Sequence, residues 1–289
     1  MVGMHGSYAA NMAVTKCDLL VAIGARFDDR VTGDVENFAP NAQIVHFDID
    51  KVEINKIVYA DISVNGDLRW SLPLLDEKLA AHETHLADRY EAWRTFVLDM
   101  KAAHPFTTRD LPDAVSPQKL FEEVQKWTDD DTIVVTDVGQ HQMWAAQFFD
   151  LNKPRRFVTS GGLGTMGYGL PAAMGAKLGC PKSKVDVKTI VLHNNVLGMV
   201  NQWQRMFYNG HCAESVINDN PDLTAVSASM GVPGTAVHKP EDLAKAVETL
   251  FQTEGPALLD VFIPADENVY PMVPGGKRLD QMVLGGEGK

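Results

Sequence analysis

The sequence is poor in cysteine and in aromatic residues and has no long apolar run, and each shortage excludes a class of protein. Its three cysteines, Cys17, Cys180 and Cys212, stand far apart without disulfide or metal-ligand spacing, which favours a reducing compartment. No stretch approaches the ~18 consecutive apolar residues of a membrane span, and the N-terminus does not resemble an export signal. We therefore expect an unexported, cytoplasmic protein with no membrane partner.

Basic residues are scarce relative to acidic ones. The 289 residues include 26 Lys and Arg against 38 Asp and Glu, a formal charge of −12. An acidic surface without a basic stripe repels phosphodiester polymers, which excludes nucleic acid as a partner. The 45% hydrophobic and 22% charged content is that of an ordinary globular protein. At ~150 residues per domain, the length indicates about two domains.

Short apolar runs alternate with helical patterns, which predicts an α/β fold with parallel sheets in two domains. A segment with prolines at 105, 112 and 117 separates the domains, because proline cannot continue a helix. The predicted boundaries are 1–103, a linker at 104–117, and 118–289, where Ser116 caps a helix with Pro117 in its first position. Strands are expected at 19–23, 43–49, 62–64, 132–138, 156–159, 187–192 and 257–263.

Candidate ligand-binding residues follow the strands of the second domain. Ligands of open parallel sheets bind beyond the carboxyl ends of the strands, near helix N-termini. Gly139, Gln140 and His141 follow one strand, although a tight turn with an incidental histidine is the simpler explanation of this segment read alone. The stretch TSGGLGTMGYGLP, with glycines at 161, 162, 164, 167 and 169, favours close backbone approach to a ligand over a plain turn.

Two further strand ends carry polar residues with two possible roles. Asn194 and Asn195 follow an apolar strand, where they could cap a helix or offer amide oxygens to Mg²⁺. In the first domain, Arg26 suits a phosphate and Asp50 suits ribose hydroxyls, so this strand edge suits a nucleotide. A solvated charge cluster is the alternative there.

Taken in order, the segments GMHG, GARFDDRVTG, HFDID, VGQHQMWAAQ, SGGLGTMGYGLPAA, NNVLGMVNQWQ and VYPMVPGGKRLDQM resemble the large catalytic subunit of acetolactate synthase. The resemblance implies a partial FAD-binding middle domain and a domain for the diphosphate and Mg²⁺ of thiamine diphosphate, without the family's first domain. It implies a transferase that condenses pyruvate with a second 2-keto acid, with loss of CO₂, in branched-chain amino-acid biosynthesis. The flavin of this family is structural.

The resemblance also assigns site residues. It places FAD against Met4, His5, Gly6, Arg26, Asp50 and Asp61, and thiamine diphosphate against Gly139, Gln140, His141, Gly162, Leu163 and Met166. It places 2-keto acid substrates near Asp28, Arg30 and Trp203. The stretch from Tyr270 to Met282 resembles an arm that folds over the closed site. Implied protein partners are a second copy or an intact large subunit, and a regulatory small subunit.

One family motif is missing. Family members carry a strand ending in Gly-Asp-Gly-Ser and then a helix before the asparagine pair, whereas here few residues separate Pro181 from Asn194. We infer that one βα unit is absent together with the metal-binding aspartate. Asn194 and the carbonyl of Val196 remain as metal ligands, which predicts weak binding of Mg²⁺ and thiamine diphosphate. The glutamate that promotes cofactor activation in this family belongs to the absent first domain, so no catalytic residue is assigned.

Two functions are therefore compatible with the sequence. The chain is either an acetolactate synthase segment that is inactive alone, or a non-catalytic truncated product or assembly partner of an intact large subunit. Glyoxylate carboligase is the next most similar thiamine-dependent enzyme, but the QWQ and PGGKRLDQM segments argue against it. An organellar origin stays compatible with the sequence, because a transit peptide would have been lost with the first domain.

Overall fold

The computed structural model describes residues 1–81, 86–109, 111–181 and 186–285, and the chain divides into two compact units. The first unit comprises Met1–Phe106 and Tyr270–Lys289, and the second comprises Thr107–Val269. The division after Phe106 lies within the segment 104–117 expected to be a linker. The C-terminal stretch, grouped with the second domain in the sequence analysis, lies in the first unit. None of the described helices is long and apolar enough to cross a membrane.

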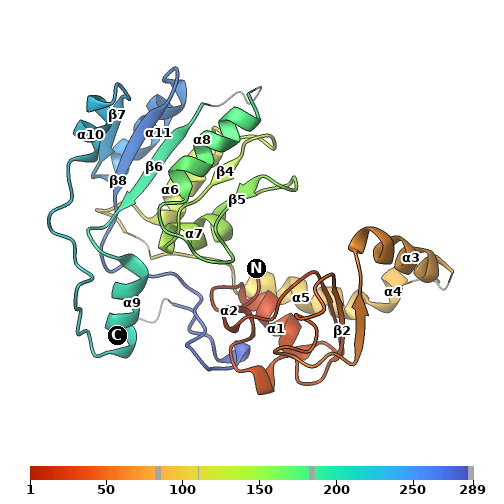
Figure 1. Cartoon of the computed structure of the whole chain (residues 1–289). Helices are drawn as coiled ribbons and strands as arrows, with labels where there is room; N and C mark the ends of the chain where they lie inside the picture. The colour runs from red at the N-terminus through yellow and green to blue at the C-terminus, as the bar shows by residue number, and fades with distance from the viewer. Residues whose placement is uncertain (82–85, 110, 182–185, 286–289) are drawn as a thin grey trace. The chain divides into compact units, whose positions relative to one another are not determined.

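The first unit contains a parallel sheet with strand order β1-β2-β3, formed by Leu19–Ile23, Gln43–Asp48 and Ile62–Asn65. Its helix α1 packs against α5 (Figure 1). Phe27, Phe38 and Ile44 are buried between the sheet and the surrounding segments, and Val273 of the C-terminal stretch joins them. The helices are α1 (Tyr8–Lys16), α2 (Asp29–Thr32), α3 (Leu68–Ala80), α4 (Leu86–Arg89) and α5 (Glu91–Ala103), with 3-10 turns at Val35–Asn37 and Leu279–Gln281.

The second unit contains two separate parallel sheets (Figure 1). One pairs β4 (Val134–Val135) with β5 (Phe157–Val158), and the other has the order β6-β8-β7. The strands of the larger sheet are β6 (Lys188–His193), β7 (Gly234–Val237) and β8 (Ala257–Phe262). The helices are α6 (Pro117–Gln125), α7 (Gln140–Phe148), α8 (Gly169–Gly179), α9 (Gly198–Phe207), α10 (Leu223–Ser229) and α11 (Pro240–Gln252).

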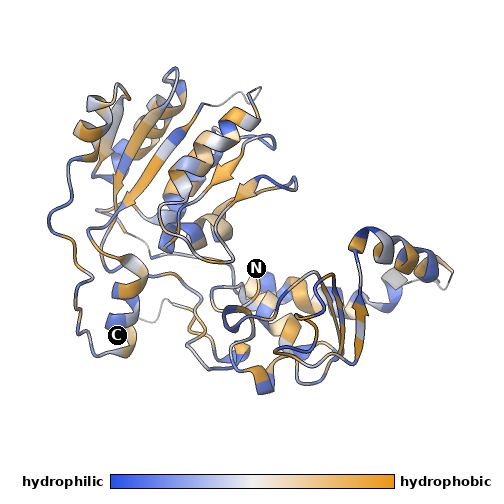
Figure 2. Cartoon of the chain, in the orientation of Figure 1, coloured by the Kyte–Doolittle hydropathy of each residue, from blue (hydrophilic) through white to orange (hydrophobic). Residues whose placement is uncertain are grey.

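The core of the second unit forms where α6, α7 and α11 cover the strands. Leu120, Trp144, Val247 and Leu259 are almost completely buried there. The strands are mainly hydrophobic and the helices are mixed (Figure 2), as expected for amphipathic helices packed on a buried sheet. The Ser116 hydroxyl accepts a hydrogen bond from the Lys119 N–H, which confirms the predicted N-cap of α6.

Strands β4 and β5 are shorter than the sequence predicts. The expected strands at 132–138 and 156–159 reduce to Val134–Val135 and Phe157–Val158. Within the described residues, β4 pairs with β5 alone, whereas β8 pairs with a strand on each side. These two strands form a short ladder of their own, whereas β6, which also has one strand partner among the described residues, reaches six residues.

Candidate cofactor site at the strand ends

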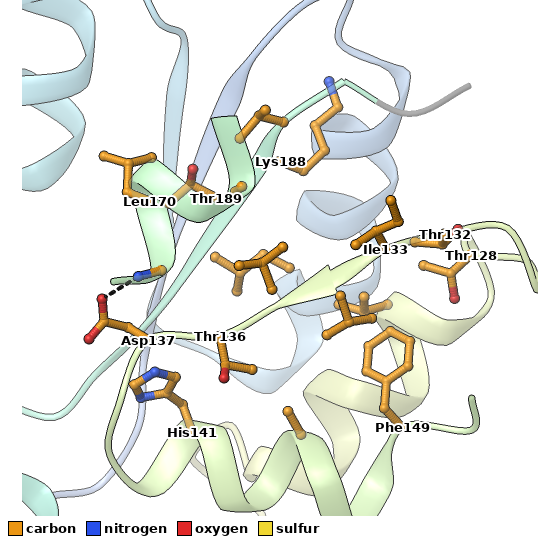
Figure 3. A pocket seen from close by; sticks show the side chains of 18 of the residues that line it. Thr128, Thr132, Ile133, Thr136, Asp137, His141, Phe149, Leu170, Lys188 and Thr189 are labelled. Atoms are coloured by element: carbon orange, nitrogen blue, oxygen red, sulfur yellow. Dashed lines mark hydrogen bonds between the residues drawn. The ribbon is translucent and has the colours of Figure 1, made fainter. Parts of the chain in front are cut away.

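The carboxyl end of β4 holds a carboxylate that the sequence analysis did not single out. Asp137 accepts hydrogen bonds from the N–H groups of Val138 (2.8 Å), Gly167 (3.0 Å) and Gly169 (2.8 Å), the last drawn in Figure 3. Burial raises the pKa of Asp137, but these donors outweigh it and hold the pKa below its ordinary value. The glycine-rich loop and the start of α8 are thereby tied to β4. A carboxylate two residues before Gly139 and close to a helix start was the available signal.

This arrangement leaves no room for a side chain at Gly169. A Cβ there would lie 2.7 Å from the Asp137 backbone nitrogen, closer than real contacts allow. We expect Gly169→Ala to lower the free energy of unfolding by roughly 1–2 kcal/mol, measured by urea titration. The matched control is Gly175→Ala in the same helix, where a Cβ meets nothing within 4 Å, and this change should stabilise the protein slightly. Equal effects of the two substitutions would contradict this account.

Gln140 and His141 begin α7 beside this carboxylate. Gln140 is buried, and its Nε2 donates to Gln202 Oε1 (3.0 Å) and to the carbonyl of Glu267 (2.8 Å). Its Oε1 accepts from Asn194 Nδ2 (3.2 Å). The amide of Gln140 therefore holds α7, α9 and the end of β6 together. Burial lowers the pKa of His141 more than the nearby Asp137 raises it, so the imidazole is neutral near pH 7.

The predicted cofactor residues of the glycine-rich loop lie at the surface of the second unit. Leu163 is 93% exposed and Met166 is 69% exposed, which is unusual for large apolar side chains. Gly164 and Gly167 adopt positive φ of 68° and 84°, and a Cβ on Gly162 would meet nothing within 4 Å. The loop therefore offers an open apolar surface that could receive a planar ring.

The predicted metal ligands do not form a magnesium site. Asn194 Oδ1 accepts from the N–H of Val196 (3.2 Å), and its Nδ2 donates to Gln140. No group of three acidic, histidine or cysteine side chains in the described part of the chain could hold a metal ion. Mg²⁺ requires several hard oxygen donors in octahedral geometry. The residues present therefore do not fit a magnesium diphosphate.

The neighbouring histidine serves a different network. His193 Nδ1 lies 3.0 Å from Asp260 Oδ2, and its Nε2 lies 2.8 Å from Asn195 Oδ1. Both His193 and Asp260 are buried, and Asn220 also donates to Asn195. This network fixes the end of β6 to β8. Asp260 was not found from the sequence, because an acidic residue inside an apolar strand gives no spacing signal.

Trp203 lies on α9 and is half-buried. Its indole meets the Phe207 ring edge-on at 5.5 Å between centroids. On the same helix, Gln202 is fully buried and its Oε1 accepts from the Val269 N–H (2.9 Å). The orientation of α9 is thus set by buried amides, which places Trp203 on the less buried side of the helix.

An ion pair between a buried carboxylate and a half-exposed arginine lies close to the Gln140 network. Glu267 has a side chain only 2% exposed, and its Oε1 accepts from Arg109 Nε. Burial raises the pKa of Glu267 even against the opposing effect of Arg109. Arg109 also pairs with Asp266 at 3.0 Å. These residues were not singled out from the sequence, since 158 positions separate Arg109 from Glu267.

In the first unit, the residues predicted to contact the flavin lie where three backbone segments are hydrogen-bonded to one another. The N–H of Met4 donates to the Arg30 carbonyl (2.7 Å), and the Met4 carbonyl accepts from Val273 (2.8 Å). His5 is buried with Nδ1 3.1 Å from the Pro271 carbonyl. A Cβ at Gly6 would lie 2.7 Å from the Met1 carbonyl oxygen, which excludes a side chain there. A 50 Å³ hollow beside Met4 is smaller than ligand pockets of ~300 Å³ or more.

The remaining predicted residues of the first unit lie in two groups. Arg26 pairs with Asp28 at 3.2 Å, and Asp28 caps α2 by accepting from the N–H of Arg30 (3.0 Å). Arg30 itself pairs with Asp29 and is largely exposed.

The second group lies along β2. Asp50 follows the carboxyl end of this strand, where it accepts from the Val52 N–H (2.9 Å). Asp61 instead accepts from the Ile44 N–H (2.7 Å), near the start of β2. Because Asp50 and Arg26 follow the carboxyl ends of β2 and β1, they lie on the edge that suits a nucleotide. Asp61 lies at the opposite end of the strand.

Comparison with known proteins gives relatives for the whole chain. It is 38% identical to acetolactate synthase 1, chloroplastic, of Nicotiana tabacum over 320 residues, which cover 100% of this chain and 48% of the relative. It is 38% identical to the acetolactate synthase isozyme 2 large subunit of Escherichia coli, covering 98% of this chain and 54% of the relative. It is 42% identical to the acetolactate synthase large subunit of Parasynechococcus marenigrum, covering 98% of this chain and 49% of the relative.

The chain spans about half the length of the curated relatives it matches. The tobacco comparison extends over 320 residues, 31 more than the 289 of this chain. The thiamine pyrophosphate enzyme central domain matches residues 1–75, and the C-terminal TPP binding domain matches in two blocks, 137–185 and 180–261. The interruption lies between α8 and β6. The chain therefore belongs to the thiamine pyrophosphate enzymes and carries segments of their central and C-terminal domains.

Proposed function

We propose that this chain is a segment of an acetolactate synthase large subunit that does not perform the family's reaction by itself. That reaction condenses pyruvate with a second 2-keto acid and releases CO₂ for branched-chain amino-acid synthesis. One observation carries the proposal: the predicted metal ligands Asn194 and Val196 lack a metal-binding carboxylate, since no group of three acidic, histidine or cysteine side chains among the described residues could hold a metal ion. Anchoring of a magnesium diphosphate needs that carboxylate.

The proposed cofactor sites use the residues that the resemblance assigns. Arg26 and Asp50 would hold the nucleotide part of FAD, with Met4 and His5 toward the flavin. The open loop around Leu163 and Met166 suits the rings of thiamine diphosphate. The start of α8 does not suit the diphosphate, because Asp137 already accepts from its N–H groups. A bound anion would have to displace that carboxylate.

The test is acetolactate formation from pyruvate with thiamine diphosphate, Mg²⁺ and FAD. The purified chain should give no product above the enzyme-free blank, while the large subunit of the E. coli relative is assayed beside it as positive control. Turnover by the chain alone would refute the proposal. Product formation in a mixture that is no faster than with the intact subunit alone would show that the chain does not complete a working site in trans.

An assembly role is favoured by one feature of α8. Leu170, Met174 and Leu178 follow one another at four-residue spacing and are 57%, 55% and 81% exposed. Such an apolar stripe on a helix is typical of a surface covered by protein. Sedimentation with and without an intact large subunit tests this role. The role is supported if Met174→Glu abolishes association while Leu74→Glu, at an exposed position of α3, leaves it intact. A chain that stays monomeric with and without the intact subunit would exclude the role.

A further inference from the structure

Strands β4 and β6 form two walls of one cavity in the second unit. The cavity has a volume of about 520 Å³ and lies between these strands (Figure 3). Thr132, before β4, and Lys188, at the start of β6, lie at one end of the cavity, whereas Asp137, after β4, and His141 of α7 lie at the other (Figure 3). Among the described residues, β4 pairs only with β5 and β6 only with β8, so both sheets end at this cavity.

The edges that face the cavity are identified by the hydrogen bonds on the other side of each strand. The carbonyls of Val187 and His193 accept hydrogen bonds from N–H groups of β8 and of the residue that follows it. Because successive residues of a strand direct their backbone groups to alternate sides, those of Ile190 and Leu192 point away from β8. The N–H groups of Val134 and Thr136 donate toward β5. The backbone of Val135 therefore faces the cavity. Two rows of peptide groups lie on opposite walls.

The remaining two walls are apolar. Helices α6, α7 and α11 contribute Leu120, Phe121, Val124, Ala145 and Phe251, and α8 contributes Leu170, Ala173 and Ala176. A strand between such layers is covered on both faces, so its side chains must be apolar at consecutive positions. Burying peptide groups without hydrogen-bond partners is costly, and a compact apolar ligand could not satisfy the two edges.

We propose that this cavity is the docking site for an extended apolar segment of a second polypeptide, which pairs in parallel with β4 and β6 and joins the two sheets. The relatives indicate that a segment of the family is missing from this chain. The tobacco comparison includes 31 positions beyond the length of this chain, and the C-terminal domain match is interrupted between α8 and β6. This inference concerns strand pairing and does not depend on the proposed catalytic role.

The probe is a fluorescent synthetic peptide with the sequence that the E. coli relative carries between the positions matching Pro181 and Val187. Anisotropy titration with the full chain should give saturable binding with a roughly micromolar Kd. A scrambled peptide and a peptide N-methylated along its strand should bind at least about tenfold more weakly, because N-methylation removes the pairing donors. The N-methylated peptide keeps the apolar side chains.

Two variants of α8 locate the binding. Ala173→Trp places a large ring in the cavity and should abolish binding, whereas Gly175→Trp in the same helix, where a Cβ would meet nothing within 4 Å, should leave it unchanged. Circular dichroism checks that both variants fold. If Ala173→Trp does not fold, the comparison of the N-methylated with the unmodified peptide on the unaltered chain tests the proposal. Absence of binding by the unmodified peptide, or equal binding by the scrambled or N-methylated peptide, would overturn the proposal. Full binding to folded Ala173→Trp would also overturn it.

Discussion

The chain should bind thiamine diphosphate with Mg²⁺ at least about a hundredfold more weakly than a variant that carries the missing segment of the E. coli relative between Pro181 and Val187. The described residues offer one amide oxygen and one backbone carbonyl near the expected metal position. These neutral donors cannot offset the charge of a diphosphate as a carboxylate does. Insertion supplies the strand and its acidic residue together.

Isothermal titration calorimetry with and without Mg²⁺ measures this difference. The matched control is the same insertion with Asn in place of the aspartate of its Gly-Asp-Gly-Ser motif, which restores the strand without the carboxylate. If only the aspartate form binds, metal coordination is the limiting loss. Equal binding by both inserted variants would show that strand pairing alone rebuilds the site, and tight magnesium-dependent binding by the unaltered chain would refute the prediction.

Local sequence patterns predicted the elements whose partners are present. The expected strand at 19–23 and the one beginning at 43 agree with β1 and β2, because each is an apolar run beside a parallel neighbour. The predicted cap and first residue of α6, Ser116 and Pro117, are also confirmed. By contrast, β4 is shorter than predicted. The bounds of a strand are set by the backbone pairs it makes, and a single-segment pattern does not contain those pairs.

The site was harder to predict for a related reason. The sequence analysis found Gln140 as a residue at a strand end, but its hydrogen bonds join it to Gln202, Asn194 and Glu267 from three other segments. Such long-range pairing carries no local periodicity. The same holds for Asp137, whose carboxylate meets the backbone some 30 residues later. Sequence spacing therefore found where strands occur and left the partners of the nearby side chains undetermined.

Acidification should destabilise the first unit through His5. Burial lowers the pKa of His5 from 6.5 to about 4, and the nearby Arg30 lowers it further against the opposing hydrogen bond to Pro271. The unfolded state therefore binds the proton more readily, and stability decreases as the pH falls from 6.5 toward 4. At about pH 5 the loss amounts to about 2 kcal/mol relative to neutral pH.

Urea unfolding near neutral pH and at about pH 5 measures the effect in the parent chain and in His5→Gln, which keeps a polar group but cannot titrate. His5→Gln should lose about 2 kcal/mol less on acidification than the parent. Val14→Ala is the matched control, because it weakens the buried core of the same unit without changing a titratable group, and it should keep the full pH dependence. If His5→Gln retained the parent's pH dependence, the acid sensitivity would originate from a group other than His5.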